Sequence, residues 1–119
     1  MTYLAKCPGS CSDYSPGTDA VWFKIHHAGK LADGSWASDP FITDQPYSFK
    51  LPASLASGNY IVRHELIALH SAYAYPGIQS YPSCFQITVT GTGTGTGPSK
   101  KVAFPGEYTA TTPGVVYDM

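Results

Sequence analysis

Residues 63–71 read Arg-His-Glu-Leu-Ile-Ala-Leu-His-Ser, and residues 77–84 read Gly-Ile-Gln-Ser-Tyr-Pro-Ser-Cys. Side chains two positions apart share one face of a β-strand. A turn at Tyr75-Pro76-Gly77 separates the two stretches, so Gln79 and Tyr81 begin a second strand on a common face. His70, Gln79 and Tyr81 all donate or accept hydrogen bonds, and this arrangement lets them converge. The alternative is a strand whose polar side chains are merely solvated or internally satisfied.

The two-residue period of half-buried strands recurs along the chain. It appears at residues 21–26, 47–51 and 84–90, and the turn signal Gly58-Asn59 leads into an expected strand over residues 60–70. The only helical tendency is one turn at residues 53–57. Several short strands separated by turns predict an all-β, antiparallel β-sandwich.

Residues 91–97 alternate glycine with threonine. A stretch of this composition is typical of a flexible linker between domains. Too little chain follows it to form a second domain, since the sequence ends at residue 119. We therefore expect residues 91–99 to form a flexible loop that carries the tail back across the sandwich, within a single domain over residues 1–119.

Composition excludes two classes of partner. Charged residues make up 13% of the chain and the formal net charge is -1, so no basic patch is available for nucleic acid. No apolar run is long enough to span a membrane. The first residues also lack the basic start and apolar core of a signal peptide. An apolar fraction of 43% suffices for a core if the strands find partners.

Other candidate sites are weaker. His26 and His27 are adjacent, so on a strand they point to opposite faces, and we expect both to be surface residues. His64 lies about 20 Å from His70 on an extended strand, too far to share a metal ion. Glu65 beside Arg63 is either a general acid or, more commonly for i and i+2 neighbours, half of a salt bridge. No second carboxylate stands at a spacing that favours glycosidase chemistry.

The two quoted stretches resemble the C-terminal signature of the fungal lytic polysaccharide monooxygenases of auxiliary activity family nine, formerly glycoside hydrolase family 61. Other segments match that family in the same order: residues 3–7, 22–25, 52–60, 104–108 and 112–115. The resemblance implies an immunoglobulin-like or fibronectin III-like antiparallel β-sandwich with long loops. It also implies a secreted, extracellular copper enzyme that cleaves the β-1,4 bonds of cellulose or related glucans oxidatively.

The resemblance assigns roles to the residues of the first paragraph. His70 and Gln79 match outer-sphere residues that position oxygen species near copper. Tyr81 matches the tyrosine on the axial side of the metal, where it would act only if the copper site is complete. In the family these residues support copper and do not replace its nitrogen ligands.

The histidine brace that holds copper in the family is absent from this sequence. The brace takes an N-terminal histidine and an internal histidine upstream of the segment matching residues 3–7, whereas this chain begins Met1-Thr2. The resemblance therefore implies a truncated, C-terminal half of the enzyme. We expect such a chain to lack tight copper binding and normal monooxygenase activity, because a lone tyrosine and outer-sphere groups make a poor copper site.

Three cysteines leave one unpaired. If Cys7 and Cys11 form a short local bridge, Cys84 remains, and an odd count points to a missing or intermolecular partner. The family resemblance implies a partner in the other half of the enzyme. A buried free thiol is the alternative. Open strand edges left by truncation, or Cys84 itself, would favour a homodimer.

Aromatic residues support a second class of function. Exposed tyrosine rings stack on the faces of glucose units, which gives a noncatalytic polysaccharide-binding or structural sandwich. Tyr108 is the leading candidate, because it matches a tyrosine on the family's planar substrate face. Tyr73 and Tyr75 follow, on the loop after His70. For all three the alternative is a partly buried ring that caps the sandwich.

Overall fold

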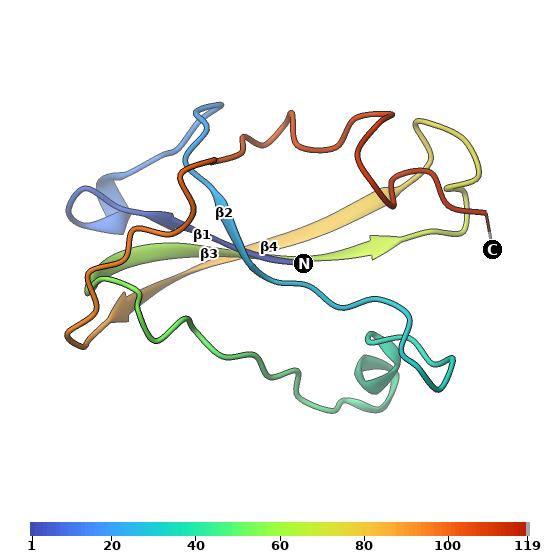
Figure 1. Cartoon of the computed structure of the whole chain (residues 1–119), viewed down its shortest axis with the longest axis horizontal. Coiled ribbons are helices and arrows are strands. Elements are labelled where there is room, and N and C mark those ends of the chain that lie inside the picture. Colours follow the sequence, from blue (N-terminus) through green and yellow to red (C-terminus); the bar gives the residue numbers. More distant parts are fainter. Residues whose placement is uncertain (119) are drawn as a thin grey trace.

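A computed structural model describes residues 1–118 and shows an open, four-stranded antiparallel sheet (Figure 1). The strands lie in the order β2-β1-β3-β4. Their bounds are Thr2–Lys6 for β1, Phe23–His26 for β2, Gly58–Ala68 for β3 and Gln79–Val89 for β4. Two short 3-10 helices, η1 at Cys11–Asp13 and η2 at Asp39–Thr43, lie in the connections. The predicted all-β, antiparallel class is confirmed, although the described strands form one open sheet.

The β3–β4 hairpin is the longest element of the fold. Its two 11-residue strands pair without interruption from Gly58↔Val89 to Ala68↔Gln79. β4 therefore begins five residues earlier than the alternation at residues 84–90 alone indicated. Pro82 does not interrupt the pairing, because its partner Glu65 uses its backbone N–H and C=O to bond with Met1 on the opposite side. A proline without an N–H is tolerated at such a position of an edge strand.

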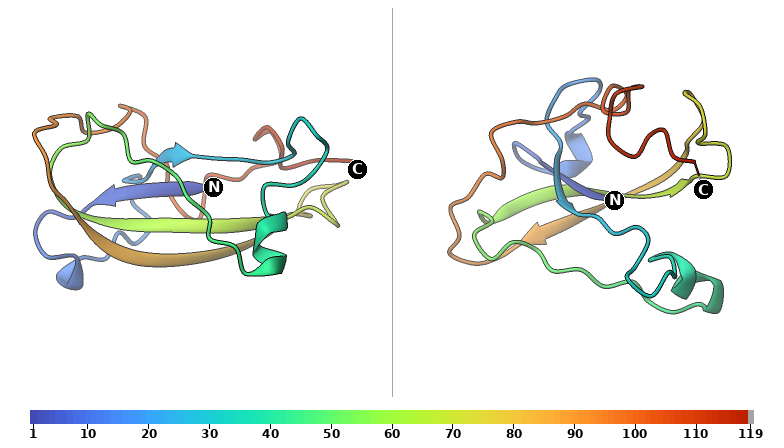
Figure 2. Two further views of the ribbon diagram at one scale, coloured as in Figure 1. Left: turned by 90° about the horizontal axis from the view of Figure 1, so that it is seen from below. Right: turned by 45° about the vertical axis from the view of Figure 1, so that its right-hand side comes forward.

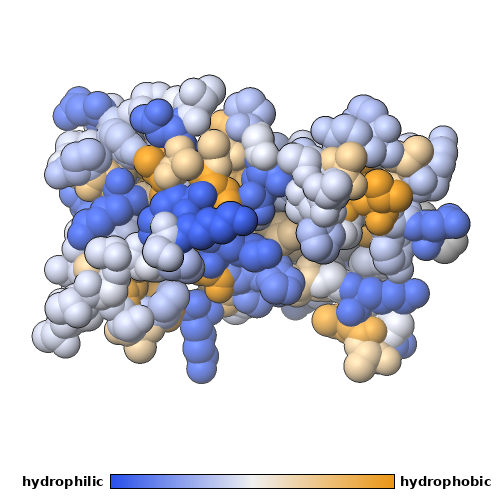
Figure 3. Space-filling model, turned by 45° about the horizontal axis from the view of Figure 1, so that its top comes forward, coloured by the Kyte–Doolittle hydropathy of each residue, from blue (hydrophilic) through white to orange (hydrophobic). Residues whose placement is uncertain are grey.

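Apolar residues pack against both faces of the sheet. One cluster contains Leu4, Phe23, Leu55, Tyr60 and Val62. The other joins Tyr3, Ala5 and Trp22 to Phe104. Figures 1 and 2 show the two covering segments on opposite sides of the strands: residues 44–57 in green and the C-terminal tail in red. On the face drawn in Figure 3 the surface is mostly hydrophilic, with apolar residues in small patches.

The strand predicted at residues 47–51 is wrong, because the structure has no strand there. Its alternating rings are used for packing instead: Tyr47 and Phe49 contact the imidazoles of His26 and His64. Pro46 and Pro52 flank the segment and lack the N–H that a ladder needs. The helical turn expected at residues 53–57 is a hydrogen-bonded turn in which Leu55 N–H donates to the Pro52 carbonyl.

Residues 91–99 carry the chain from β4 back across the sheet. Gly95 exchanges backbone hydrogen bonds with Ser54 and Ala56, at 2.7 and 2.8 Å. A side chain at Gly97, whose φ is +77°, would collide with the ring of Phe23. These glycines therefore allow the loop to approach the core closely. The flexibility expected of the loop stays a prediction.

Cys7 and Cys11 are joined by a disulfide that closes the loop after β1. Cys84 lies on β4 and is exposed, which contradicts the alternative of a buried thiol. Within residues 1–118, no helix is long and apolar enough to cross a membrane.

Candidate functional site

The turn between β3 and β4 brings His70, Gln79 and Tyr81 together. His70 lies just beyond the end of β3, and Gln79 and Tyr81 share one face of β4. Gly77 makes the turn possible, because a Cβ there would lie 1.9 Å from the Ser71 carbonyl oxygen. The side chain of Gln79 lies between the other two and contacts both.

These contacts form a chain of two hydrogen bonds. The Tyr81 hydroxyl donates to Oε1 of Gln79 at 2.7 Å, and Nε2 of Gln79 lies 3.2 Å from Nε2 of His70. Because the tyrosine fixes the orientation of the amide, the amide nitrogen faces the imidazole and donates to it. His70 therefore accepts this hydrogen bond at Nε2. All three side chains are exposed.

A copper site requires more donors than this cluster provides. It contains one imidazole, one phenol and one amide, whereas copper(II) prefers several nitrogen ligands. Among residues 1–118, no group of three or more His, Cys, Asp or Glu side chains is placed to hold a metal ion. The residues present do not by themselves fit copper.

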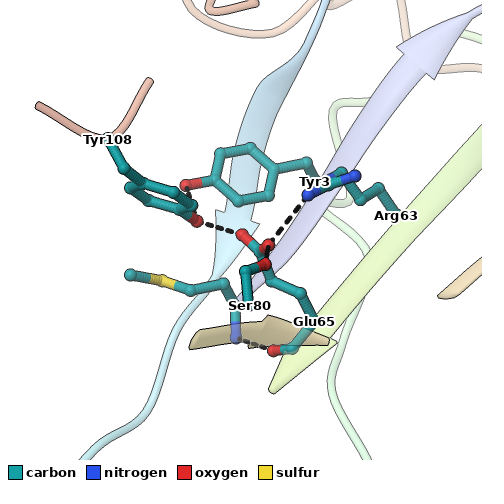
Figure 4. A network of polar contacts seen from close by, with 6 residues as sticks. Tyr3, Arg63, Glu65, Ser80 and Tyr108 are labelled. Atoms are coloured by element: carbon teal, nitrogen blue, oxygen red, sulfur yellow. Dashed lines mark hydrogen bonds and ion pairs between the residues drawn. The ribbon is translucent and has the colours of Figure 1, made fainter. Parts of the chain in front are cut away.

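A second cluster, buried under the C-terminal tail, is centred on Glu65 (Figure 4). The Glu65 carboxylate is 1% exposed and lies 3.0 Å from Nη2 of Arg63. It also accepts hydrogen bonds from the hydroxyls of Ser80 and Tyr108, and the Tyr3 hydroxyl lies 3.4 Å from that of Tyr108. The salt-bridge interpretation of Glu65 is thus confirmed. The contacts of Tyr3 and Tyr108 in this cluster could not be predicted from the sequence, because both residues are distant from Glu65 along the chain.

Burial and these contacts change the acidity of both tyrosines. Burial, together with the hydrogen bond to Glu65, raises the pKa of Tyr108 far above its ordinary value. Burial also raises the pKa of Tyr3, and the contact with Tyr108 opposes that rise in part. Both phenols therefore stay protonated, and the Tyr108 hydroxyl remains a donor to Glu65.

The three tyrosines considered for substrate stacking are not equivalent. Tyr73 and Tyr75 lie in the turn after His70 and are 71% and 49% exposed, so neither is a buried cap. Tyr108 is half-buried, and its hydroxyl points inward to Glu65 (Figure 4). The structure thus leaves the rings of Tyr73 and Tyr75 more accessible than that of Tyr108.

The remaining histidines take part in packing. His26 is half-buried and its Nε2 lies 2.6 Å from the Tyr47 hydroxyl, so the expectation of a surface residue is wrong for His26; His27 is exposed. His64 Nδ1 lies 2.9 Å from the Thr2 hydroxyl. Burial, assisted by the nearby terminal ammonium group and His26, lowers the pKa of His64.

Solved structures with this fold identify the class of protein. The chain matches a glycoside hydrolase family 61 member, Cel61B from Hypocrea jecorina, with a TM-score of 0.84 and 36% identity over 98% of this chain and 51% of that one. It also matches a cellulose-active polysaccharide monooxygenase from M. thermophila, with a TM-score of 0.75 and 38% identity over 98% of this chain and 55% of that one. The fold is thus that of the polysaccharide monooxygenase β-sandwich, as expected from the resemblance.

The chain belongs to Auxiliary Activity family 9 (formerly GH61), whose sequence profile it matches over residues 1–119. It is 67% identical to the AA9 family lytic polysaccharide monooxygenase B of Malbranchea cinnamomea, over all of this chain and 48% of that protein. It is 57% identical to monooxygenase F of Botryotinia fuckeliana, over 49% of that protein. The chain thus spans about half the length of the curated relatives it matches.

Proposed function

We propose that this chain is the C-terminal part of a copper-dependent lytic polysaccharide monooxygenase that acts on cellulose or a related β-1,4-glucan outside the cell. The observation that carries the proposal is the hydrogen-bonded chain from Tyr81 through Gln79 to His70. In this proposal the chain supplies the supporting side of the copper site, and the histidine brace comes from sequence outside it. The Cys7–Cys11 disulfide supports an extracellular location.

Each residue of the cluster has a distinct part in the proposed whole enzyme. Copper, with oxygen or peroxide and a reductant, would supply the oxidising chemistry. Tyr81 would be one of the residues beside the metal and would hold the amide of Gln79 through its hydrogen bond. Gln79 in turn would orient His70, and these two would hydrogen-bond an oxygen species beside the metal. Without the brace, the isolated chain would have no normal monooxygenase activity.

A chimera tests this assignment. The chain would be joined to the unmatched half of the Malbranchea cinnamomea monooxygenase, to which it is 67% identical in the matched half. With copper, ascorbate and cellulose, the chimera should release oxidised oligosaccharides, and the isolated chain should not. Gln79→Ala should reduce the yield at least about tenfold, the lower end of the effect of one positioned hydrogen-bonding group.

Gln86→Ala is the matched control, because Gln86 is an exposed glutamine of the same strand on the opposite face. It should leave the yield unchanged. Equal yields from a folded Gln79→Ala chimera and the parent would contradict the role of Gln79. Oxidised products from the isolated chain would contradict the dependence on an external brace.

A noncatalytic polysaccharide-binding module is the second candidate. The exposure of the Tyr73 and Tyr75 rings favours it, since stacking on glucose needs no metal. One protein can have both functions, because the binding surface and the oxidation site use different residues. Mutation of each set separately distinguishes them.

We also propose that the isolated chain self-associates through β4. This strand pairs with β3 on one side only, and Tyr81, Cys84 and Phe85 on it are exposed. Exposed edge strands promote pairing between molecules. Light scattering with and without reductant should show a dimer whose reductant-sensitive fraction is lost on Cys84→Ser. A monomer under both conditions would contradict this proposal.

A further inference from the structure

Ser80 connects the buried cluster around Glu65 to the exposed chain of hydrogen bonds at the start of β4. Its hydroxyl donates to Oε2 of Glu65 at 2.5 Å. Along β4, Ser80 lies between Gln79 and Tyr81. Consecutive side chains of a strand point to opposite faces, so Gln79 and Tyr81 lie on one face and Ser80 on the other. The backbone of residues 79–81 thus separates the two clusters, and Ser80 joins them.

The Ser80 hydroxyl also supplies a contact with β3 that the backbone of Ser80 does not make. In an antiparallel pair, only alternate residues exchange backbone hydrogen bonds with the facing strand. Tyr81 and Gln79 exchange theirs with Leu66 and Ala68 of β3, so the backbone groups of Ser80 point away from β3. Gln79 is the first residue of β4, and the end of a strand opens more easily than its middle. The hydroxyl therefore holds β4 against β3 where the pairing is weakest.

Three parts of the fold meet at the Glu65 carboxylate (Figure 4). Arg63 on β3 supplies the countercharge, Ser80 belongs to β4, and Tyr108 belongs to the C-terminal tail. A buried ion pair is often no more stabilising than apolar residues of similar size, so it is weak evidence for stability. Its hydrogen bonds are directional, however, and a fully bonded buried network rigidifies the segments that donate to it. Glu65 is thus placed to fix the geometry of β4.

We propose that Glu65 is a positioning residue for the chain of Tyr81, Gln79 and His70, and that it acts through Ser80. The hydrogen bond from Ser80 holds the first residues of β4 in place. Gln79 then presents its amide to His70 at the observed distance of 3.2 Å. The expected effect on oxidation rests on the proposed function, whereas the effect on the start of β4 is measurable in the isolated chain without copper.

Substitutions of Ser80 test the proposal with little disturbance of the core. Ser80 is exposed, so Ser80→Ala removes the hydroxyl without leaving a buried cavity. Glu65 keeps its contacts with Arg63 and Tyr108 in this variant. Ser80→Thr retains a hydroxyl on a residue that strands favour, and should preserve the contact. Ser83→Ala is the matched control, because Ser83 is an exposed serine of the same strand on the opposite face.

Hydrogen exchange of the isolated chain gives the first measurement. In Ser80→Ala, the Gln79 backbone amide should exchange about tenfold faster, as expected for loss of one hydrogen bond to a charged group. The Val62 amide, in the middle of β3, should be unaffected. Ser80→Thr and Ser83→Ala should match the parent at both amides. Unchanged Gln79 exchange in Ser80→Ala would overturn the proposal. Equal acceleration at Val62 would also overturn it, because the hydroxyl would then stabilise the whole sheet.

Product formation by the chimera described above gives the second measurement. At saturating cellulose, Ser80→Ala should lower the rate of oxidised-product release roughly tenfold, the lower end of the effect of a residue that supports a metal site from outside its ligands. The fraction of chimera bound to cellulose should stay unchanged, and Ser80→Thr should restore the rate. A folded Ser80→Ala chimera with the parental rate would overturn the proposal. An inactive parent chimera would contradict the proposed function instead, and the exchange measurement would still decide whether Ser80 holds Gln79.

Discussion

The Tyr108 hydroxyl donates a hydrogen bond to the buried carboxylate of Glu65, and this contact ties the C-terminal tail to the middle of β3. The two residues lie 43 positions apart in the sequence. Arg63 supplies the countercharge on the same strand, and its guanidinium lies 4.1 Å from the ring centre of Phe104. One carboxylate thus links β3 to the aromatic residues of the tail.

Replacement of the Glu65 charge should destabilise the fold strongly. Glu65→Gln keeps a group that accepts from Tyr108 but leaves the Arg63 guanidinium without its countercharge. Removal of one partner of a buried ion pair costs about 3–5 kcal/mol; because Arg63 is partly exposed, we expect about 3 kcal/mol. Urea unfolding measures this loss. Glu107→Gln, a half-buried control outside the ion pair, should have little effect, and equal losses from both variants would contradict the account.

Alkaline pH should unfold the protein through its buried phenols. The pKa of Tyr108 is raised by burial and by Glu65, so the folded state holds its proton more tightly than the unfolded state does. Stability from this group is fully present below the unfolded pKa of 10.0 and falls as the pH rises above that value. Urea midpoints between pH 8 and about 11 should decline more steeply for the parent than for Tyr108→Phe. Parallel profiles would show that Tyr108 is not the responsible group.

Mild acid should weaken the fold through His64. Its folded pKa lies below the ordinary value of 6.5 because of burial, the terminal ammonium group and His26. Stability from the neutral imidazole is therefore present above pH 6.5 and is lost as the pH falls through the folded pKa. His64→Asn should flatten the thermal melting profile in this range. His27→Asn, at an exposed position, should retain the parent's profile, and a loss of pH dependence in that control instead would refute the assignment.

The turn after β3 should contribute to cellulose binding. Tyr73→Ala and Tyr75→Ala should each weaken pull-down on microcrystalline cellulose by roughly tenfold, if sugar stacking is comparable to stacking on bases at about 1–3 kcal/mol per ring. Their melting temperatures should stay unchanged because both rings are exposed. Tyr108→Ala should lower the melting temperature as well, because it removes a donor to Glu65.

Ile42→Ala is the control for the binding measurement. Ile42 is 84% exposed and lies on η2 rather than in the β3–β4 turn. It should bind cellulose like the parent. Full retention of binding in the Tyr73→Ala, Tyr75→Ala double variant would leave the turn without a role in substrate recognition.

The β3–β4 hairpin and its polar cluster were predictable from sequence for a local reason. The two-residue period sets which side chains share a face, and the turn fixes which residues of the two strands meet. Gln79 and Tyr81 therefore lie on one face of β4 whatever the rest of the chain does. Their meeting with His70 needs only a short turn.

Other features depended on contacts that a local pattern does not encode. Residues 47–51 have the alternation of a strand, but their rings pack on His26 of β2 and His64 of β3, and their backbone pairs with no strand. The contact of Tyr108 with Glu65 joins distant segments whose approach is set by the packing of the tail. For Glu65 the sequence predicted only a salt bridge with Arg63, its neighbour two positions away on the same strand.

We propose that this chain provides supporting residues of a copper site and that the principal ligands come from sequence outside it. Calorimetric titration of Cu(II) into the isolated chain and into the chimera described above tests it most directly. We predict tight, one-to-one binding by the chimera and no submicromolar site in the isolated chain. Submicromolar binding of one copper ion by the isolated chain, abolished by His70→Ala, would contradict it.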